Sequence, residues 1–502
     1  MLVAIRIQKV KTGASWQKAN IVIDAATVTG EAPRLWMALA QGGEEPFPML
    51  DLISSQLREL SPRYIRLDHV FDFYNIISEK EGKFTYDWRR FDFALNEILQ
   101  TGALPYLSLS YMPLAISSGD LTSPPRDWQA WSELVKALVE HVSGRYNRNL
   151  DNVYYEVWNE PDLFGQWTIG KAEDFPANCQ NVNSKDYRCL YYYSIIGAGR
   201  GVEVNSFLIG GPAITDPRPS KQRDFLPLFL NFVKANNLRL DFLSWHRYHT
   251  RPEVFRQDLD FVDSLLPSPA GQSPPGGVWA APQKIISEWG SVPEKSPIHD
   301  QAFDAAHAAS VIRLLLDRVD LAFSFEIKDG ESEKEFHGGW GLLSHEKFGA
   351  RPKPKYYALK LLNQMVGNRL KLTGEGTYID AWAIEDKGTI RAVLVNYDPA
   401  GKHEELVPVS FIGLGPGTYE YIEAPLSGTE SVFREEVRTL RAESPELLCQ
   451  GSETPCRKPQ IAIYPTLDKA GLSGTGVKGS FFRFVSLPAQ GIVFLTLTRR
   501  EE

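Results

Sequence analysis

Short apolar runs alternate with amphipathic stretches over most of the chain, from about residue 33 to residue 365. Short apolar runs are typical of buried strands, and stretches with apolar residues at every third or fourth position are typical of helices that cover a sheet. Helical stretches of this kind include Asp127–His141 and Phe303–Arg318. The predicted strands are Leu35–Ala40, Tyr64–Asp68, Leu104–Ser110, Val153–Glu160, Phe207–Gly210, Phe242–His246, Lys284–Glu288 and Leu321–Glu326.

Eight βα units in sequence predict an α/β fold, a (β/α)8 TIM barrel. An open doubly wound sheet is the alternative, but residues 33–365 contain neither of the Gly-rich phosphate turns, G-x-G-x-x-G and the P-loop, that such sheets usually carry. A barrel takes about 250 residues or somewhat more. Because the chain has 502 residues, we expect a barrel at residues 31–365 and a second domain.

The pattern changes after residue 366 to short strands separated by Gly and Pro turns, such as Ala381–Ile384, Ile390–Asn396 and Gly417–Ile422. Many short strands with such turns are typical of a β-sandwich. Residues 1–30 hold two further short strands, which are too few to form a domain alone. We therefore expect an accessory β-sandwich built from residues 366–502, with the strands of residues 1–30 joining it.

Composition and charge narrow the range of partners. The formal net charge of −8 gives no attraction to the phosphates of nucleic acids or to anionic membranes, so nucleic acid is not expected as a ligand. No apolar run approaches the roughly 20 residues that cross a bilayer, so no membrane span is expected. Aromatic residues make up 12% of the chain. Flat rings of this kind pack well on the C–H faces of sugars, which is a first hint of a saccharide ligand.

The four cysteines form two local pairs in polar stretches, Cys179 with Cys189 and Cys449 with Cys456. This arrangement indicates two small disulfide loops, and the alternative is four unlinked thiols in a reducing compartment. Neither pair has the C-x2–4-C spacing and neighbouring His of a zinc site. The paired cysteines favour an extracytoplasmic location, but the first residues lack the pattern of a signal peptide, so the compartment stays open.

Two glutamates close predicted strands, Glu160 in Val157–Pro161 (VWNEP) and Glu288 in Ile286–Gly290 (ISEWG). Side chains at the C-terminal ends of barrel strands project into one common face, so these two carboxyl groups are expected to meet. An ionised carboxylate after an apolar strand is unfavourable unless it has a partner or a role. Two carboxyl groups flanking one carbon atom cleave glycosidic bonds without a cofactor or a metal ion. The alternative is two ordinary surface glutamates.

A series of short motifs supports this interpretation between about residues 35 and 365. They are Tyr64–Arg66 (YIR), Leu107–Pro113 (LSLSYMP), Trp158–Pro161 (WNEP), Ile209–Ala213 (IGGPA), Asp241–Tyr248 (DFLSWHRY), Ser287–Trp289 (SEW), Phe336–Leu343 (FHGGWGLL) and Pro352–Leu362 (PKPKYYALKLL). In this order they resemble glycoside hydrolase family 39, which belongs to clan A of the retaining barrel glycosidases. The family contains β-xylosidases, α-L-iduronidases and exopolysaccharide-cleaving enzymes. WNEP is shared with sister families, whereas FHGGWGLL followed by PKPKYYALKLL is more specific.

The resemblance implies roles for particular residues. Glu160 corresponds to the general acid/base, Glu288 to the nucleophile, and Asn159 to the residue that hydrogen-bonds the sugar 2-hydroxyl group. His246 and Tyr248 match an H-x-Y motif after the sixth strand, where they would orient the nucleophile and bind a sugar hydroxyl group. The alternative for His246 is a buried structural histidine.

Two further residues have roles that the sequence leaves open. Arg66 would pair with a catalytic carboxylate and keep it ionised, and its alternative is a plain salt bridge. Tyr111 matches an aromatic residue that lines the substrate site, and its alternative is a core aromatic residue.

Three positions depart from the family pattern. Asp68, followed by His69, stands where the β-xylosidases tend to have the His of R-x-H. The eighth predicted strand lacks a Trp, so the platform beneath the sugar would be missing or supplied by Trp289 or Trp340. Tyr248 stands where iduronidase-like members have a Lys that suits a uronate carboxylate. A uronic acid substrate is therefore not expected, although Arg247 or Arg251 could replace that Lys.

The sequence predicts a β-xylosidase-like exo-glycosidase that acts on neutral sugars with retention of configuration, and its partner is an oligo- or polysaccharide. Two alternatives remain. One is an endo-acting polysaccharide or exopolysaccharide hydrolase of the same family, and the other is a carbohydrate-binding protein without turnover. The sequence gives no indication of the oligomeric state.

Overall fold

The computed structural model describes residues 16–45, 47–219, 224–266, 281–426, 460–463 and 479–500. The described chain divides into two compact units. One unit is Pro33–Val366, and the other contains residues 16–32 together with the described residues from 367 onward. The predicted strand within the first ten residues lies outside the described residues.

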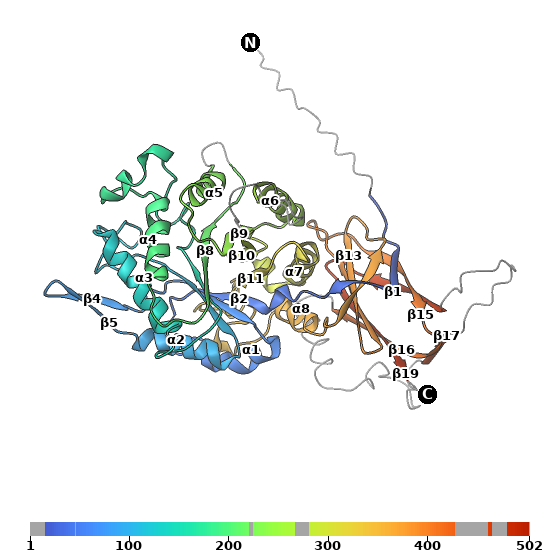
Figure 1. Cartoon of the computed structure of the whole chain (residues 1–502). Helices are drawn as coiled ribbons and strands as arrows, with labels where there is room; N and C mark the ends of the chain where they lie inside the picture. Colours follow the sequence, from blue (N-terminus) through green and yellow to red (C-terminus); the bar gives the residue numbers. More distant parts are fainter. Residues whose placement is uncertain are drawn as a thin grey trace, which may run out of the picture. The chain divides into compact units, whose positions relative to one another are not determined.

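The first unit contains a closed barrel of eight parallel strands, in the order β2, β3, β6, β7, β8, β9, β10, β11, which closes through pairing of β11 with β2 (Figure 1). This confirms the predicted (β/α)8 fold. The barrel strands are β2 Ala38–Gln41, β3 Tyr64–Leu67, β6 Leu104–Ser108, β7 Val153–Glu156, β8 Phe207–Ile214, β9 Phe242–Tyr248, β10 Gln283–Gly290 and β11 Leu321–Phe325.

Helices surround the barrel because their apolar faces cover the outer side of the sheet (Figure 1). In the third helix the buried residues Leu134, Val135, Leu138 and Val142 repeat with helical spacing, and Asp127 caps the first turn by accepting from the backbone N–H of Gln129. The helices are α1 Ser54–Leu60, α2 Arg89–Gln100, α3 Trp128–Val142, α4 Tyr187–Gly199, α5 Phe225–Ala235, α6 Pro252–Leu265, α7 Ala302–Leu315 and α8 Pro354–Leu362.

Short elements lie between these strands and helices. The 3-10 helices are η1 Leu35–Met37, η2 Asp51–Ile53, η3 Ala172–Asp174, η4 Ala177–Gln180, η5 Pro297–Asp300 and η6 Glu346–Phe348, and the hairpin strands are β4 Ile77–Lys80 and β5 Lys83–Tyr86.

Aromatic side chains fill part of the barrel interior. Tyr64, Tyr106, Tyr154, Phe242 and Phe323 belong to one buried cluster. Because side chains alternate across a strand, β3 presents Tyr64 and Arg66 to the interior and Ile65 and Leu67 to the helices. Aromatic side chains therefore fill the lower part of the barrel interior, and charged side chains such as Arg66 lie at the C-terminal ends of the strands.

The ends of the predicted strands differ from the observed ones by up to four residues. Leu35–Ala40 was predicted as one strand, but its first half forms η1 and only Ala38–Gln41 pairs in the barrel. Val153–Glu160 was predicted to end at Glu160, whereas β7 ends at Glu156. The apolar character of Val157 and Trp158 reflects burial in a loop, since both side chains are fully buried outside the strand.

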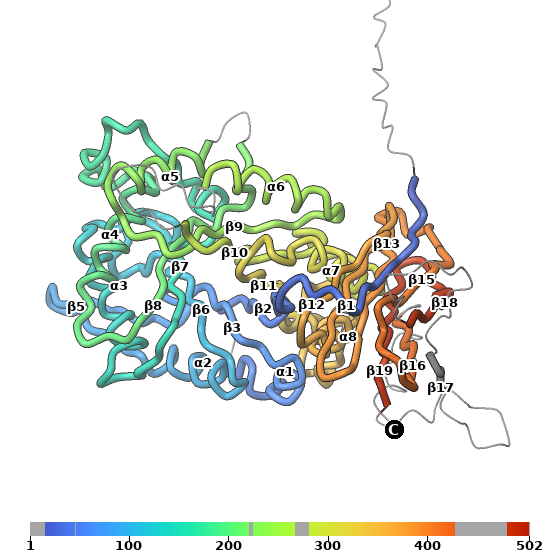
Figure 2. The backbone as a smooth tube through the Cα atoms, turned by 45° about the vertical axis from the view of Figure 1, so that its right-hand side comes forward, coloured from blue at the N-terminus to red at the C-terminus, as the bar shows by residue number. Residues whose placement is uncertain are grey.

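The second unit is a mixed sheet of nine strands, in the order β17, β16, β19, β14, β13, β12, β1, β15, β18. Strand β1 comes from the N-terminal part of the chain and lies between β12 and β15, as Figure 2 shows. The strands are β1 Ile21–Glu31, β12 Asn368–Thr373, β13 Ile379–Asp386, β14 Thr389–Asn396, β15 Glu405–Leu414, β16 Gly417–Leu426, β17 Gln460–Ile463, β18 Gly479–Leu487 and β19 Ile492–Arg500.

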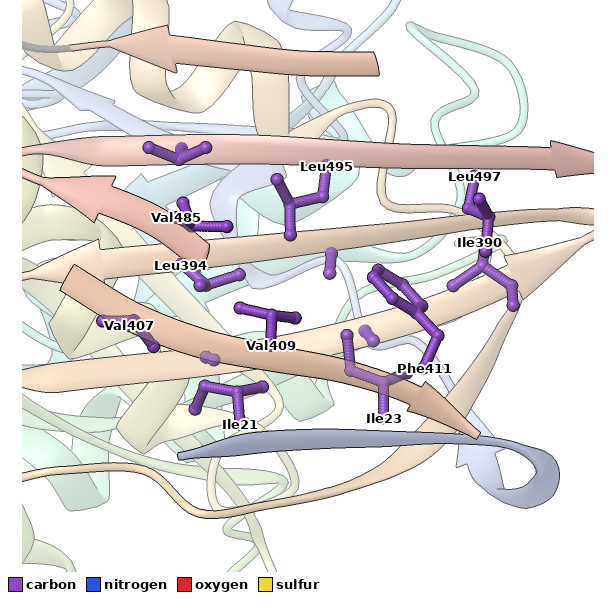
Figure 3. Close-up of a cluster of buried hydrophobic side chains, with 14 of the residues drawn as sticks. Ile21, Ile23, Ile390, Leu394, Val407, Val409, Phe411, Val485, Leu495 and Leu497 are labelled. Atoms are coloured by element: carbon purple, nitrogen blue, oxygen red, sulfur yellow. The ribbon is translucent and has the colours of Figure 1, made fainter. Parts of the chain in front are cut away.

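This sheet folds over one hydrophobic core. In β15, Val407, Val409 and Phe411 are buried and alternate with more exposed residues. They share a cluster with Ile23 of β1 and Leu495 of β19, although β1 and β19 are not neighbours in the sheet (Figure 3). The predicted sandwich is thus one continuous sheet that encloses its core.

The loop between β7 and α4 is closed by a disulfide between Cys179, in η4, and Cys189, in α4. Cys449 and Cys456 lie outside the described residues. In the described part of the chain, no helix has the length and apolarity needed to cross a bilayer.

Candidate active site

A cavity of about 700 Å³ opens at the C-terminal ends of the barrel strands. This volume is within the range of small-ligand sites. Of the residues predicted from the sequence, those that line it are Asp68, Tyr111, Asn159, Glu160, Tyr248, Glu288 and Trp340. Arg66 and His246 are fully buried and contact these residues from below.

Glu160 is placed by a tight loop after β7. Trp158 and Glu160 both have positive φ, at 74° and 47°, a conformation that non-glycine residues adopt only when surrounding contacts hold it. The indole N–H of Trp158 donates to the carbonyl of Phe164 at 3.1 Å, and the backbone N–H of Glu160 donates to the carbonyl of Ala213 at 3.1 Å. These contacts turn the Glu160 side chain into the cavity.

Glu288 lies near the end of β10, where its two carboxylate oxygens have different donors. Arg66 Nη1 donates to Oε1 at 2.8 Å, and the hydroxyl group of Tyr248 donates to Oε2 at 2.8 Å. One carboxylate oxygen of Glu160 and one of Glu288 lie within 4.8 Å of each other. The sequence-distant acids therefore meet in one cavity.

Arg66 connects three side chains across the barrel interior. Its Nε donates to Glu156 at 2.8 Å and its Nη2 donates to the Asn159 side-chain oxygen at 2.7 Å, in addition to the contact with Glu288. The amide nitrogen of Asn159 in turn donates to the hydroxyl oxygen of Tyr111 at 2.8 Å. The orientation of the Asn159 amide is thus set on both sides.

Burial and charge act in opposite directions on the central ionisable groups. Burial raises the pKa of Glu288, with a further rise from Glu160, while His246 and Arg66 oppose it. Burial disfavours the charged form of His246, but Glu288 and Glu160 outweigh it and raise the His246 pKa. Nδ1 of His246 lies 2.9 Å from Glu160 Oε1 and 3.6 Å from Glu288 Oε2. Glu288 and His246 therefore titrate as an interacting pair.

Two groups of side chains bring potential metal ligands close together, each with three ligand atoms within 4.8 Å. They are Glu160, His246 and Glu288, and Glu44, His69 and Asp72. In the first group, protein groups contact three of the four carboxylate oxygens, at Glu160 Oε1 and at both oxygens of Glu288. These contacts hold both carboxylates in fixed positions in the cavity.

His69 and Asp72 form a second ionic contact beside the cavity, with Nδ1 of His69 2.8 Å from Asp72. Burial opposes the charged form of His69, but Asp72, Asp68 and Glu44 outweigh it and raise the pKa of His69 to about 9. Its ring packs edge-on against Tyr111, with centroids 4.8 Å apart. His69 therefore stays protonated at neutral pH, and its charge is balanced by neighbouring carboxylates.

One wall of the cavity is acidic and contains Asp68, Glu45 and Glu326. Asp68 Oδ1 accepts from the backbone N–H of Gly43 at 2.8 Å, which anchors that side chain. Arg247 also lines the cavity, but its guanidinium group is paired with Asp216 and Asp258. Arg247 is therefore not free to pair with an anionic ligand.

Trp289 does not reach the cavity. Its ring is fully buried, packs against Phe255 and His307, and carries the ammonium group of Lys355 over its face at 5.2 Å. Side chains alternate along β10, so the residue after Glu288 points outward to the helices. Trp340 lines the cavity and contacts Phe325. Phe325 is the last residue of the eighth strand, the strand in which the sequence lacks the Trp of the family pattern.

Sequence reasoning missed two residues of the site. Glu156 is fully buried and is held by Arg66 and by the hydroxyl group of Tyr106 at 2.8 Å. A carboxylate inside the apolar run Val153–Val157 was the available signal, because such a residue requires a buried partner. Glu326 ends the eighth predicted strand, but nothing in the sequence shows that its side chain faces the cavity.

Comparisons with known proteins agree with this geometry. The profile of the family "Glycosyl hydrolases family 39" matches residues 48–259. A β-xylosidase from Caldicellulosiruptor saccharolyticus is 27% identical over 385 residues, which cover 70% of this chain and 69% of that protein. A β-xylosidase from Geobacillus stearothermophilus is 27% identical over 401 residues, covering 72% and 74%. The chain is thus similar to glycoside hydrolase family 39 over residues 48–259 and to these β-xylosidases over about 70% of its length.

Solved structures show the same fold. The GH39 enzyme from Xanthomonas axonopodis pv. citri superposes with a TM-score of 0.70 at 21% identity and covers 98% of this chain and 100% of its own. A monomeric β-xylosidase from Caulobacter crescentus CB15 gives a TM-score of 0.69 at 20% identity, covering 96% and 100%. The family profile and the two curated relatives identify the protein as a retaining glycoside hydrolase of clan A, similar to β-xylosidases, and its substrate is a saccharide.

Proposed function

We propose that this glycoside hydrolase is an exo-acting β-xylosidase that cleaves neutral glycosides by double displacement, with Glu288 as nucleophile and Glu160 as acid/base. The observation that carries the proposal is the approach of the two carboxyl groups to within 4.8 Å in one cavity. Retaining glycosidases place these groups about 5–5.5 Å apart, and inverting ones about 6.5–9.5 Å apart.

In the first step, Glu288 attacks the anomeric carbon while Glu160 protonates the leaving oxygen. Arg66 and Tyr248 hold the two oxygens of Glu288 and stabilise its ionised form, which is the form that attacks. In the second step, Glu160 removes a proton from water, which displaces Glu288 and releases the sugar with retained configuration. Asn159 lies beside both acids and is suited to bind the 2-hydroxyl group, since Arg66 and Tyr111 fix its amide.

The charges around the cavity favour a neutral sugar. A uronate would bring its own carboxylate close to Asp68 and Glu45, and Arg247 is already paired. Repulsion between a substrate carboxylate and carboxylates in the same cavity opposes binding. The relatives from Caldicellulosiruptor saccharolyticus and Geobacillus stearothermophilus are β-xylosidases, which favours xylose among the neutral sugars. A cavity of about 700 Å³ suits the end of a chain and so supports exo action.

A panel of p-nitrophenyl glycosides tests the substrate, with β-xylose, α-arabinose, β-glucose, β-galactose and β-glucuronate as the sugars. We expect the highest kcat/KM on the xyloside and the lowest on the glucuronide. An NMR time course of the released sugar should show the β-anomer first. Release of the α-anomer first contradicts double displacement, and activity only on long polysaccharides contradicts exo action.

Two substitutions test the roles of the acids. Glu288→Gln should abolish turnover, and Glu160→Ala should slow it but regain activity when azide replaces water as the nucleophile, giving β-xylosyl azide. Glu253→Gln, at an exposed position outside the cavity, is the matched control and should behave as wild type. Full activity of Glu288→Gln would assign the nucleophile to another residue.

A further inference from the structure

Glu326 is a buried carboxyl group without a partner among the residues that the structure describes. The residue is 8% exposed, and its side chain lines the cavity. Its backbone is fixed, because its N–H donates to the carbonyl of Trp340 at 3.2 Å and its carbonyl accepts from Leu342 at 2.8 Å. Within the described residues, no group donates a hydrogen bond to the carboxyl or forms an ion pair with it, in contrast to Glu156 and Glu288.

Two lysines that could pair with Glu326 are already engaged, namely Lys353, whose charge acts on Glu326, and Lys328, two residues further along the chain. Lys353 lies 2.8 Å from Asp300 and 2.6 Å from Asp329, and it also donates to the carbonyl of Gly339. Lys328 lies 2.7 Å from Glu45 and 2.8 Å from Glu346. An unpaired buried carboxyl group is unfavourable, so a ligand in the cavity is the partner that would satisfy it.

The surroundings of Glu326 favour its neutral form. Burial raises the pKa of Glu326 well above its usual range, and Asp329, Glu45 and Asp68 add to the rise, while Lys353 opposes it. A neutral carboxyl group donates one hydrogen bond and accepts others, which matches the two-way hydrogen bonding of a sugar hydroxyl group. A carboxylate could only accept.

The barrel order indicates which part of the sugar Glu326 would meet. Glu326 follows β11, and Asn159 follows β7, which is four strands away in the closed barrel of eight. The two side chains therefore enter the cavity from opposite sides. With C1 between Glu160 and Glu288 and the 2-hydroxyl group at Asn159, Glu326 would lie near the far edge of the ring, at C3 and C4.

We propose that Glu326 is a specificity-determining, substrate-binding residue whose carboxyl group hydrogen-bonds the 3- or 4-hydroxyl group of the sugar that is released. This inference rests on the proposed function and adds a residue that its mechanism does not require. It predicts that the enzyme selects a sugar bearing a hydroxyl group at that position, and that a neutral amide can replace the carboxyl group.

The test compares variants on deoxygenated substrates. Wild type, Glu326→Gln and Glu326→Leu are assayed on p-nitrophenyl β-D-xyloside and on its 3-deoxy and 4-deoxy analogues. Glu326→Gln should retain most of the wild-type kcat/KM, because the amide donates and accepts as the neutral acid does. Glu326→Leu should lose about 10- to 100-fold on the parent xyloside, the usual effect of leaving a substrate hydroxyl group unpaired in a buried site.

The deoxy analogues separate binding from a structural role. On the analogue that lacks the contacted hydroxyl group, wild type and Glu326→Leu should differ little, whereas a merely structural role lowers kcat/KM equally on all three substrates. Equal loss, or no loss on the parent xyloside, overturns the proposal. Glu331→Leu, at an exposed position nearby and outside the cavity, is the control and should match wild type on all three.

Two further measurements distinguish failure of the proposed substrate, or misfolding of a variant, from failure of the proposed Glu326 contact. If wild type does not cleave the xyloside, the proposed substrate fails, and calorimetry with methyl β-D-xyloside and its deoxy analogues makes the same comparison by binding. If Glu326→Leu does not fold, as judged by circular dichroism, Glu326→Ala takes its place. A smaller loss on one deoxy analogue supports the contact, and the same loss on all refutes it.

Discussion

The guanidinium group of Arg66 donates to Glu156, Asn159 and Glu288, and all of these side chains are at least nine-tenths buried. A buried cation shared by two carboxylates reduces the charge of the pair, and its positive charge favours the ionised form of each acid. Burial raises the pKa of Glu156, but Arg66 and His246 outweigh it and lower that pKa, whereas the pKa of Glu288 stays raised despite them.

We predict that Arg66→Gln shifts the acidic limb of the kcat/KM profile to higher pH. Glu288 must be ionised to attack, and without Arg66 its already raised pKa rises further. The variant should also lose about 3–5 kcal/mol of unfolding free energy, because two carboxylates remain buried without their partner. Arg188→Gln, which breaks a buried pair with Asp186 outside the cavity, should destabilise but leave the limb in place. An unchanged limb in Arg66→Gln would contradict the role of Arg66.

Tyr248→Phe removes the hydrogen bond to Oε2 of Glu288 and little else, since the ring can stay in place. Hydrogen bonds to charged groups contribute about 1.5–3 kcal/mol, so kcat/KM should fall about 10- to 150-fold. Tyr191→Phe removes a hydrogen bond to the carbonyl of Arg239, outside the cavity, and should leave kcat/KM unchanged. Steady-state kinetics on the xyloside decide between these outcomes.

At the scale of elements, the loop between β7 and α4 carries Glu160, the proposed acid/base, and the Cys179–Cys189 disulfide joins the later part of that loop to α4. The two cysteines are 10 residues apart, and closing a loop of that length stabilises the folded chain by about 3 kcal/mol in the chain-entropy account.

We predict that Cys179→Ser/Cys189→Ser lowers the midpoint of urea unfolding, because the unfolded loop regains conformational freedom. Neither cysteine lines the cavity, so kcat/KM at 25 °C should stay close to that of wild type. Both measurements are made without reductant, so that Cys449 and Cys456 are treated alike in the two proteins. A large fall in kcat/KM with an unchanged midpoint would show instead that the bond positions Glu160.

The order of strands and helices in the barrel could be predicted from hydrophobic patterning, since each strand is an apolar run and each helix has one apolar face. The residues at which these elements end could not be predicted in this way. Val157 and Trp158 continue the apolar run of β7, yet they leave the strand because the indole ring packs against Tyr111, Trp131 and Trp167. Burial in a loop and burial in a strand select the same residue types.

At the scale of the whole molecule, every residue that lines the cavity belongs to Pro33–Val366, and the nine-stranded sheet has a hydrophobic core of its own. Phe411→Ala removes a fully buried ring from that core, which should cost about 3–5 kcal/mol of the sheet's stability. We predict an earlier unfolding transition by calorimetry, with kcat/KM at 25 °C retained.

Phe242→Ala is the matched substitution in the barrel interior, where Phe242 is also fully buried. It should lower the stability of the barrel and kcat/KM together, because β9 carries both Phe242 and the His246 and Tyr248 that contact the two acids. Equal loss of activity in both variants would contradict the assignment of catalysis to the barrel unit alone.

The sequence by itself determined the barrel, the β-rich second unit and the two glutamates that we propose as the catalytic acids, because these depend on local periodicity and on residue types at the ends of strands. Only the tertiary structure decided which neighbouring side chains reach the cavity. Trp289 follows Glu288 but faces the helices, whereas Glu326, after the neighbouring strand β11, enters the cavity. Which way a side chain points, and which charges surround it, depends on strand register and on residues distant in the chain.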